Sequence, residues 1–250
     1  MSGHSKWSSI KHKKAAVDSK RGKIFTKIIR EITVAAKSGG GDIDSNPTLR
    51  LAISKAKEAN MPADNITRAI KKGTGELEGV NYEEQLYEGY GPGKIGILIQ
   101  ILTDNKNRTA AEIRAIFSKR NGNMASPGAV SYLFAKKGYI EIEESQIKED
   151  DLFLLVTEAG AEDLKNENGV YEVITGLESF HEVKKALDNA GVKCVKAELA
   201  QIPETSIAIT DADTAQKLQG LIEALEDNDD VQAVYDNSDI SDEIISQLTE

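Results

Sequence analysis

The first strong hydrophobic pattern in the chain lies between residues 23 and 36. Apolar side chains recur there every three or four positions, which predicts an amphipathic helix with a buried face of Ile24, Phe25, Ile28, Ile29, Ile32 and Ala36. The run Ser-Gly-Gly-Gly at 38–41 ends this helix. A second helix is expected from Asn46 as N-cap, with Pro47 in the first helical position, to about residue 59.

A third helix is expected between Pro62 and Gly73, and its inward face consists of Ile66, Ala69 and Ile70. Three short helices with small loops predict a compact three-helix domain over residues 23–75. Residues 74–81 have the composition of a linker.

Strand and helix patterns alternate in the rest of the chain. Strands are predicted at 94–103, 170–175, 193–202, 205–210 and 231–235, with a hairpin at 131–143. Helices are predicted at 109–120, 149–165, 178–190 and 212–226. Thr109 and Glu112 have the spacing of a capping box, which would begin the first of these helices.

This order of helices and strands predicts an α+β multidomain fold, in which an N-terminal helical domain is followed by two domains of antiparallel sheet plus helices. The closing strand–helix–strand at 205–235 has too few partners to stand alone. We therefore expect it to pair with strands of 82–130. The predicted domains are a basic arm (1–22), the helical domain, a discontinuous α+β domain (82–130 plus 204–240) and an inserted α+β domain (131–203).

Composition places the chain among soluble globular proteins, with 250 residues of which 29% are charged, 40% hydrophobic and 5% aromatic. No stretch approaches 18 apolar residues, and no apolar segment follows the first charges, so neither a membrane span nor a secretory signal is predicted. The single cysteine, Cys194, excludes an intramolecular disulfide. We expect a cytoplasmic protein.

Charge is strongly segregated along the chain. Residues 1–75 hold 16 Lys and Arg against 6 Asp and Glu, a net charge of +10, whereas residues 76–250 hold 15 against 35, a net charge of −20. Such asymmetry indicates a basic segment attached to an acidic body. A polyanion would repel that body over about 8–10 Å, so its contact with the protein has to be local.

The basic arm is the strongest chemical feature of the sequence. Lys and Arg side chains that neutralise phosphates release condensed counterions, which gives affinity for nucleic acid without recognition of its base sequence. Trp7 would either stack on an exposed base or pack into the helical domain. His12 lies among lysines that repel a metal cation, which favours phosphate instead. The candidate nucleic-acid contacts in the arm and along the basic stripe of the first helix are Lys6, Trp7, Lys11, His12, Lys13, Lys14, Lys20, Arg21, Lys23, Lys27 and Arg30.

A second basic cluster lies in the otherwise acidic region, around the helix predicted at 109–120. It is either a solvated helix face or, if it shares a side with the arm, a second contact for nucleic acid. The cluster contains Lys106, and its candidate contacts for nucleic acid are Arg108, Arg114, Lys119 and Arg120.

Catalytic and cofactor motifs are not evident. Residues 91–96 match Gly-x-Gly-x-x-Gly, but a strand follows them where a dinucleotide site requires a helix, so we interpret them as a turn. The three histidines form no metal-ligand set, and no nucleophile motif is present. We therefore predict no enzyme, no cofactor and no metal site.

Several strings resemble the YebC/PmpR family, in order along essentially the whole chain. They are GHSKW (3–7), KHKKAAVDSKRGKIFTKIIREI (11–32), GGGD (39–42), NPTLRLAISKAKEANMP (46–62), Gly-Tyr-Gly-Pro-Gly (89–93) and DNKNRTAAEIR (104–114). The resemblance implies a helical N-terminal domain and two α+β domains, the middle one discontinuous.

The resemblance also implies a role in gene expression. Some members are described as DNA-binding transcriptional regulators. Others, including mitochondrial translational activators of a cytochrome oxidase subunit, act on messenger RNA or the ribosome, and some bacterial members help ribosomes through proline-rich stretches.

We predict a non-enzymatic, nucleic-acid-binding regulator, a DNA-binding transcriptional regulator of the YebC/PmpR type. The first alternative is a ribosome- or mRNA-associated translation factor that relieves stalling. The second is an enzyme or small-ligand-binding protein. The expected partners are DNA or ribosomal or messenger RNA, with the ribosome as a further candidate and no membrane.

Overall fold

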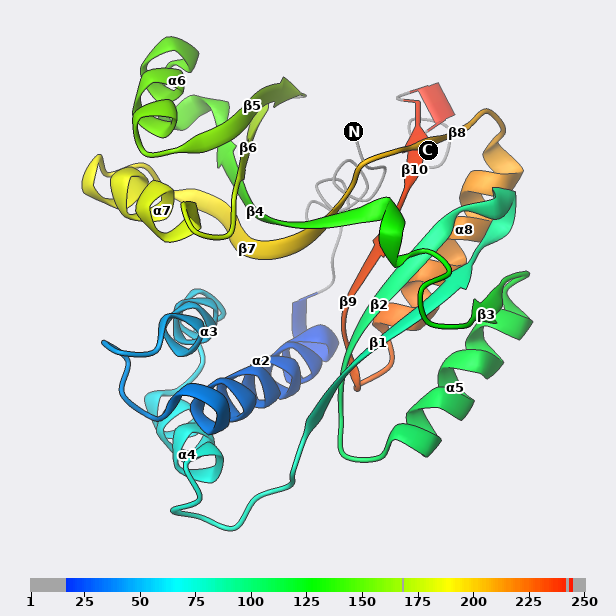
Figure 1. The fold of residues 1–250 in the computed structure, drawn as a ribbon, viewed down its shortest axis with the longest axis horizontal. Coiled ribbons are helices and arrows are strands. Elements are labelled where there is room, and N and C mark those ends of the chain that lie inside the picture. The colour runs from blue at the N-terminus through cyan, green and yellow to red at the C-terminus, as the bar shows by residue number, and fades with distance from the viewer. Residues whose placement is uncertain (1–16, 168, 242, 245–250) are drawn as a thin grey trace. The chain divides into compact units, whose positions relative to one another are not determined.

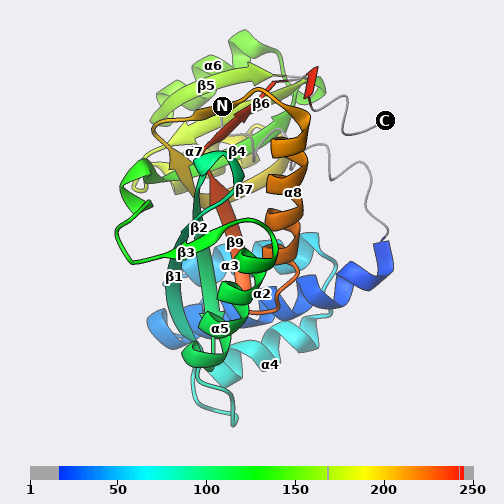
Figure 2. The ribbon, with the colours of Figure 1, turned by 90° about the vertical axis from the view of Figure 1, so that its right-hand side faces the viewer.

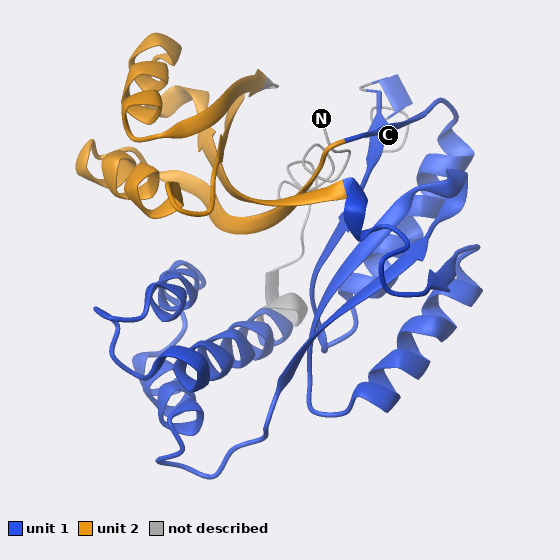
Figure 3. Ribbon diagram, viewed as in Figure 1, with its two compact units in different colours: residues 1–133, 205–250 blue, residues 134–204 orange. Residues whose placement is uncertain are grey.

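The computed structural model describes residues 17–167, 169–241 and 243–244. The described residues divide into two compact units, one formed by those within 1–133 and 205–250 and the other by those within 134–204, which are coloured separately in Figure 3. The fold is an N-terminal helical region followed by two antiparallel-sheet α+β regions, so the predicted fold class is confirmed. None of the described helices has the length and apolarity needed to cross a membrane.

The helical region consists of α2 (Val17–Gly39), α3 (Pro47–Glu58) and α4 (Ala63–Gly73). Asn46 caps α3 as predicted, since its side chain accepts a hydrogen bond from the backbone N–H of Leu49 (3.0 Å). The apolar faces of the helices meet in a core of Ile28, Ile32, Ala35, Ala36, Leu49, Ala52, Ile53, Ala56, Met61 and Ala69. The helix predicted to begin at Lys23 is already formed at Val17, so residues 17–22 of the predicted arm are helical.

The first sheet has the strand order β3-β1-β2-β9, formed by β1 (Glu83–Tyr90), β2 (Gly96–Thr103), β3 (Asn123–Ala125) and β9 (Val231–Asp236). β9 pairs antiparallel with β2, the pairing expected from the order of the elements. Helices α5 (Lys106–Lys119) and α8 (Ala212–Glu226) lie on one side of this sheet (Figure 2). The short strands β8 (Ile207–Ile209) and β10 (Ser238–Ile240) pair in parallel.

The second unit carries a sheet in the order β5-β6-β4-β7, with β4 (Phe134–Glu143), β5 (Ala161–Glu167), β6 (Val170–Thr175) and β7 (Cys194–Pro203). Helices α6 (Glu149–Glu158) and α7 (Phe180–Asn189) pack against it (Figure 1). Short 3-10 turns occupy Pro92–Lys94, Ser131–Leu133 and Glu144–Gln146.

Three sequence-based predictions are wrong in the α+β regions. The predicted hairpin at 131–143 is instead a 3-10 turn followed by one strand, β4. Gly138 lies inside β4, where a Cβ would clash with Phe180 and Thr175. The helix at 149–165 ends at Glu158, where Gly160 turns the chain with a φ of +95° into β5. The capping box at Thr109 and Glu112 does not form. α5 begins earlier instead, capped by Asn105, whose side chain accepts from the N–H of Arg108 (3.1 Å).

Glu88 of β1 closes the loop that leads to the second unit. Its buried carboxylate accepts hydrogen bonds from the N–H groups of Gly128 (2.7 Å), Val130 (2.6 Å) and Ser131 (3.0 Å). Burial alone would raise the pKa of Glu88, but these backbone donors offset it, and the net pKa is lowered. The carboxylate therefore acts as a fixed acceptor for three backbone N–H groups of this loop.

Glu88→Gln should loosen this loop. The amide replaces one acceptor oxygen with a donor that faces N–H groups, so we expect a loss of about 1–3 kcal/mol and faster hydrogen exchange at the amide of Val130. Exchange followed by NMR or mass spectrometry measures this. Unchanged protection at 128–131 would contradict the assignment, and Glu84→Gln, at an exposed position of the same strand, serves as the control.

Candidate nucleic-acid interface

The basic stripe of α2 faces acceptors within its own unit. The ammonium group of Lys23 donates to a carboxylate oxygen (3.0 Å) and the carbonyl oxygen (3.1 Å) of Asp227. That of Lys27 donates to the carbonyl of Glu226 (2.9 Å), and burial lowers the pKa of Lys27, although nearby carboxylates oppose the shift. Both residues thus bind the C-terminal end of α8 and the residue that follows it.

Arg30 is a largely buried member of the stripe, with 12% of its side chain exposed. Its guanidinium donates to the carboxylate of Asp230 (2.6 Å) and to the carbonyls of Asp229 (2.7 Å) and Leu102 (3.1 Å). It also lies 5.2 Å from the ring centroid of Tyr82. Arg30 therefore joins α2 to the first sheet.

Asp230 is the point where the two predicted basic clusters meet. Only 5% of its side chain is exposed. One carboxylate oxygen accepts from Arg30, and the other accepts from Arg108 (2.7 Å), Thr109 (2.5 Å) and Thr103 (3.2 Å). Burial alone would raise the pKa of Asp230, but hydrogen bonds from Thr109, Arg108 and Arg30 outweigh it and lower the pKa to about 2.

The basic residues of α5 divide into paired and unpaired groups. Arg108 also binds Asp104 (2.8 Å), and Lys106 forms an ion pair with Glu83. Arg114, Lys119 and Arg120 are exposed, and within the described residues no carboxylate pairs with them. The second cluster thus keeps three free cations at its C-terminal end.

Sequence reasoning missed a basic face on α4. Arg68, Lys71 and Lys72 recur three and four residues apart, so their side chains share one side of the helix. All three are exposed, and no acid of the described chain forms an ion pair with them. The opposite side packs Ile66, Ala69 and Ile70 against the helical core. The sequence does contain the signal for this face. The inward residues Ile66, Ala69 and Ile70 are evident from their spacing, and the cations lie at the positions between and after them, which face outward.

The remaining candidates lie beyond the described side chains. These are the arm residues Lys6, Trp7, Lys11, His12, Lys13 and Lys14, together with Lys20 and Arg21. For metals, the described residues contain no group of three His, Cys, Asp or Glu side chains placed to hold an ion.

Comparison with protein families covers nearly the whole chain. Residues 5–76 match a model described as the TACO1/YebC protein N-terminal domain, and residues 82–238 match one described as the TACO1/YebC second and third domain. The matched ranges meet at the linker between the helical region and the first sheet.

Similar proteins share both sequence and structure. A "Probable transcriptional regulatory protein" of Desulfosudis oleivorans is 56% identical over 244 residues, which cover 98% of this chain and 99% of the relative. One of Elusimicrobium minutum, with the same name, is 54% identical over 249 residues, covering all of both chains. The crystal structure of the conserved hypothetical protein Aq1575 from Aquifex aeolicus has a TM-score of 0.88 and 48% identity, and covers 96% of this chain and 99% of that one.

Proposed function

The chain belongs to the TACO1/YebC family, and we propose that it is a non-enzymatic, DNA-binding regulator of transcription in the cytoplasm. The names of its full-length relatives support a role in transcriptional regulation. The physical support is the set of exposed cations without protein partners in a chain whose net charge is −10. Ammonium and guanidinium groups without a protein partner can bind phosphate, which releases counterions from the nucleic acid. Groups that already form an ion pair with a carboxylate are less available for phosphate.

The contacts divide the basic residues into two roles. The cations that hold α2 and α5 to the end of α8 and the loop before β9 are Lys23, Lys27, Arg30 and Arg108. We propose that phosphate contact falls to the arm, from Lys6 to Arg21, and to the free cations of α5, Arg114, Lys119 and Arg120. The face of α4 joins them, because it is the one basic surface of the described helical region with three unpaired members on one side.

A second candidate function is translation regulation on messenger RNA or the ribosome. Residues 134–204 contain 16 Asp and Glu against 8 Lys, a net charge of −8. An acidic unit of this size fits poorly along an open duplex, since both surfaces are anionic. It suits a ribonucleoprotein, where basic proteins lie beside RNA.

Crosslinking in cells separates the two candidates. The full-length chain is crosslinked to nucleic acid, purified under denaturing conditions, and both the bound DNA and the bound RNA are sequenced. We expect enrichment of promoter DNA. Enrichment of ribosomal or messenger RNA instead would establish the second candidate. The control is the variant Arg68→Ala/Lys71→Ala/Lys72→Ala. If the wild-type chain recovers no more DNA or RNA than this variant does, the assigned surface is contradicted.

A further inference from the structure

Helix α6 exposes two large apolar side chains next to each other. Phe153 is 53% exposed and Leu154 is 61% exposed, while Leu152 and Val156 on the inner side are buried. Both outer residues belong to a helix of ten residues that already has a complete buried face. Their exposure therefore adds nothing to the core of this unit, and removing that apolar area from water would be favourable.

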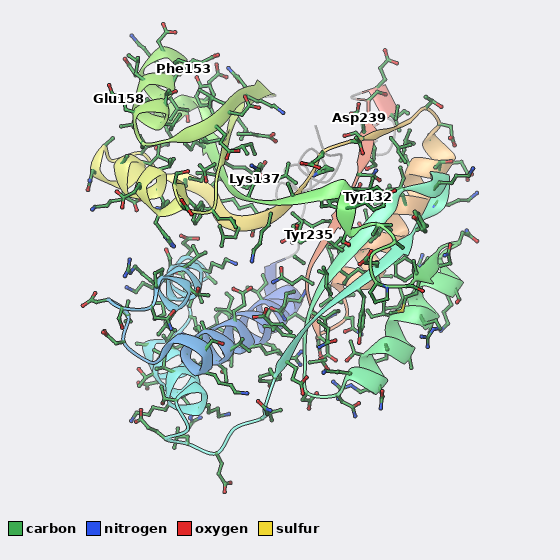
Figure 4. The ribbon with its side chains drawn as sticks, viewed as in Figure 1. Tyr132, Lys137, Phe153, Glu158, Tyr235 and Asp239 are labelled. Atoms are coloured by element: carbon green, nitrogen blue, oxygen red, sulfur yellow. The ribbon has the colours of Figure 1, made fainter. Side chains whose placement is uncertain are left out.

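Acidic side chains surround this pair. Asp150 lies three residues before Phe153 and four before Leu154, so it is next to both on the helix surface. Asp151 and Glu158 lie one turn before and after Leu154. All three are exposed, and no Lys or Arg of the described chain forms an ion pair with them. Figure 4 shows Phe153 and Glu158 on α6.

The dipole of α6 does not stabilise Glu158. Acids in the first turn of α6, such as Asp150 and Asp151, interact favourably with the helix dipole. Glu158 lies in the last turn, where the dipole disfavours a negative charge and where α6 has no basic residue. Its position is therefore explained better by a partner than by the fold.

We propose that this surface of α6, formed by Asp150, Asp151, Phe153, Leu154 and Glu158, docks a basic segment of another protein. The segment would place an apolar side chain against Phe153 and Leu154, and Lys or Arg side chains against the acids. This inference does not depend on the proposed nucleic-acid binding.

Charge argues against the other occupants of the surface. Nucleic acid and the anionic face of a lipid bilayer would be repelled by the three carboxylates. A second copy of the chain, docked by the same surface, would bring the same carboxylates together across a twofold axis. A basic protein segment is the partner whose charge complements the acids while its apolar side chains cover the pair.

Photocrosslinking in cells tests the proposal. The full chain carries p-benzoylphenylalanine in place of Phe153, which keeps an aromatic ring at the site, and each adduct is mapped to a peptide. We expect adducts to a protein segment with an excess of Lys and Arg. Glu158→Gln in the same chain should reduce their yield, because it removes a charge without weakening the helix, and Leu154→Ser should reduce it about tenfold.

Leu177→Ser is the matched control, since Leu177 is 47% exposed in the same unit but outside α6 and should leave the yield unchanged. The photoreactive residue placed at Leu177 gives the background. Circular dichroism confirms that each variant is folded. The proposal is overturned by adducts to nucleic acid, lipid or a second copy, by protein adducts that Glu158→Gln does not reduce, or by a yield no higher than the background at Leu177.

Discussion

Asp230→Ala should destabilise the first unit by about 3–5 kcal/mol, because it leaves the guanidinium of Arg30 buried without its carboxylate. The same substitution removes an acceptor from Thr103, Thr109 and Arg108, so α2, β2 and α5 lose their common partner. Urea unfolding followed by circular dichroism measures the loss. Hydrogen exchange with mass spectrometry should assign it to peptides of residues 17–133 and 205–241, with peptides of 134–204 unchanged.

Asp229→Ala is the matched control, because the Asp229 side chain is exposed and only its backbone carbonyl contacts Arg30. Its effect should stay within about 0.5 kcal/mol. Asp230→Asn keeps the shape and one acceptor oxygen, and should fall between the two. If Asp230→Ala and Asp229→Ala were equally stable, the carboxylate would not be the junction of these elements.

The stabilisation by Asp230 should also depend on pH. Its pKa is about 2 in the folded protein, below the value of about 3.9 expected when unfolded. The contribution, about 2–3 kcal/mol, is therefore fully present above pH 3.9 and is lost as the pH falls through 2. The difference in unfolding free energy between the wild-type protein and Asp230→Asn should shrink between pH 6 and pH 3. A constant difference would mean that the charge of Asp230 is unimportant.

The helical region was predictable because its signals are local. Asn46 with Pro47 specifies the start of α3 within a few residues, and the apolar spacing of α2 specifies which face is buried. β4 was not predictable, since the reason for Gly138 is the ring of Phe180, more than 40 residues away. A glycine that makes room for a distant side chain looks, in sequence, like a glycine in a turn.

The role of the α2 stripe could not be read from its spacing for the same reason. Cations at three- and four-residue intervals look alike whether they face solvent or bind carboxylates of another segment. Their acceptors in residues 226–230 lie about 200 positions away. The acidic run Glu-Asp-Asn-Asp-Asp at 226–230 was visible, but nothing in either segment indicates that the two meet.

The triple variant Arg68→Ala/Lys71→Ala/Lys72→Ala should weaken nucleic-acid binding at least about tenfold at 0.1 M salt, since three phosphate contacts would be lost. The slope of log affinity against log salt should become shallower by about 3 on duplex DNA, because each contact contributes about 0.9. Fluorescence anisotropy of the full chain measures both, with a 30-base-pair duplex of mixed sequence and a single-stranded RNA of the same length as probes.

The control for this variant removes the same charge elsewhere. Lys148→Ala/Lys185→Ala/Lys193→Ala takes three exposed, unpaired lysines from the acidic unit and changes the net charge equally. If the two triple variants weaken binding alike, only net charge matters and the face of α4 is not a contact surface. If the α4 variant binds normally while Lys11→Ala/Lys13→Ala/Lys14→Ala does not, the arm alone carries the contact. If the α4 variant and the arm variant both lose affinity while the control does not, both surfaces contact nucleic acid. The probe, DNA or RNA, that shows the larger change in salt slope would then identify the polyanion.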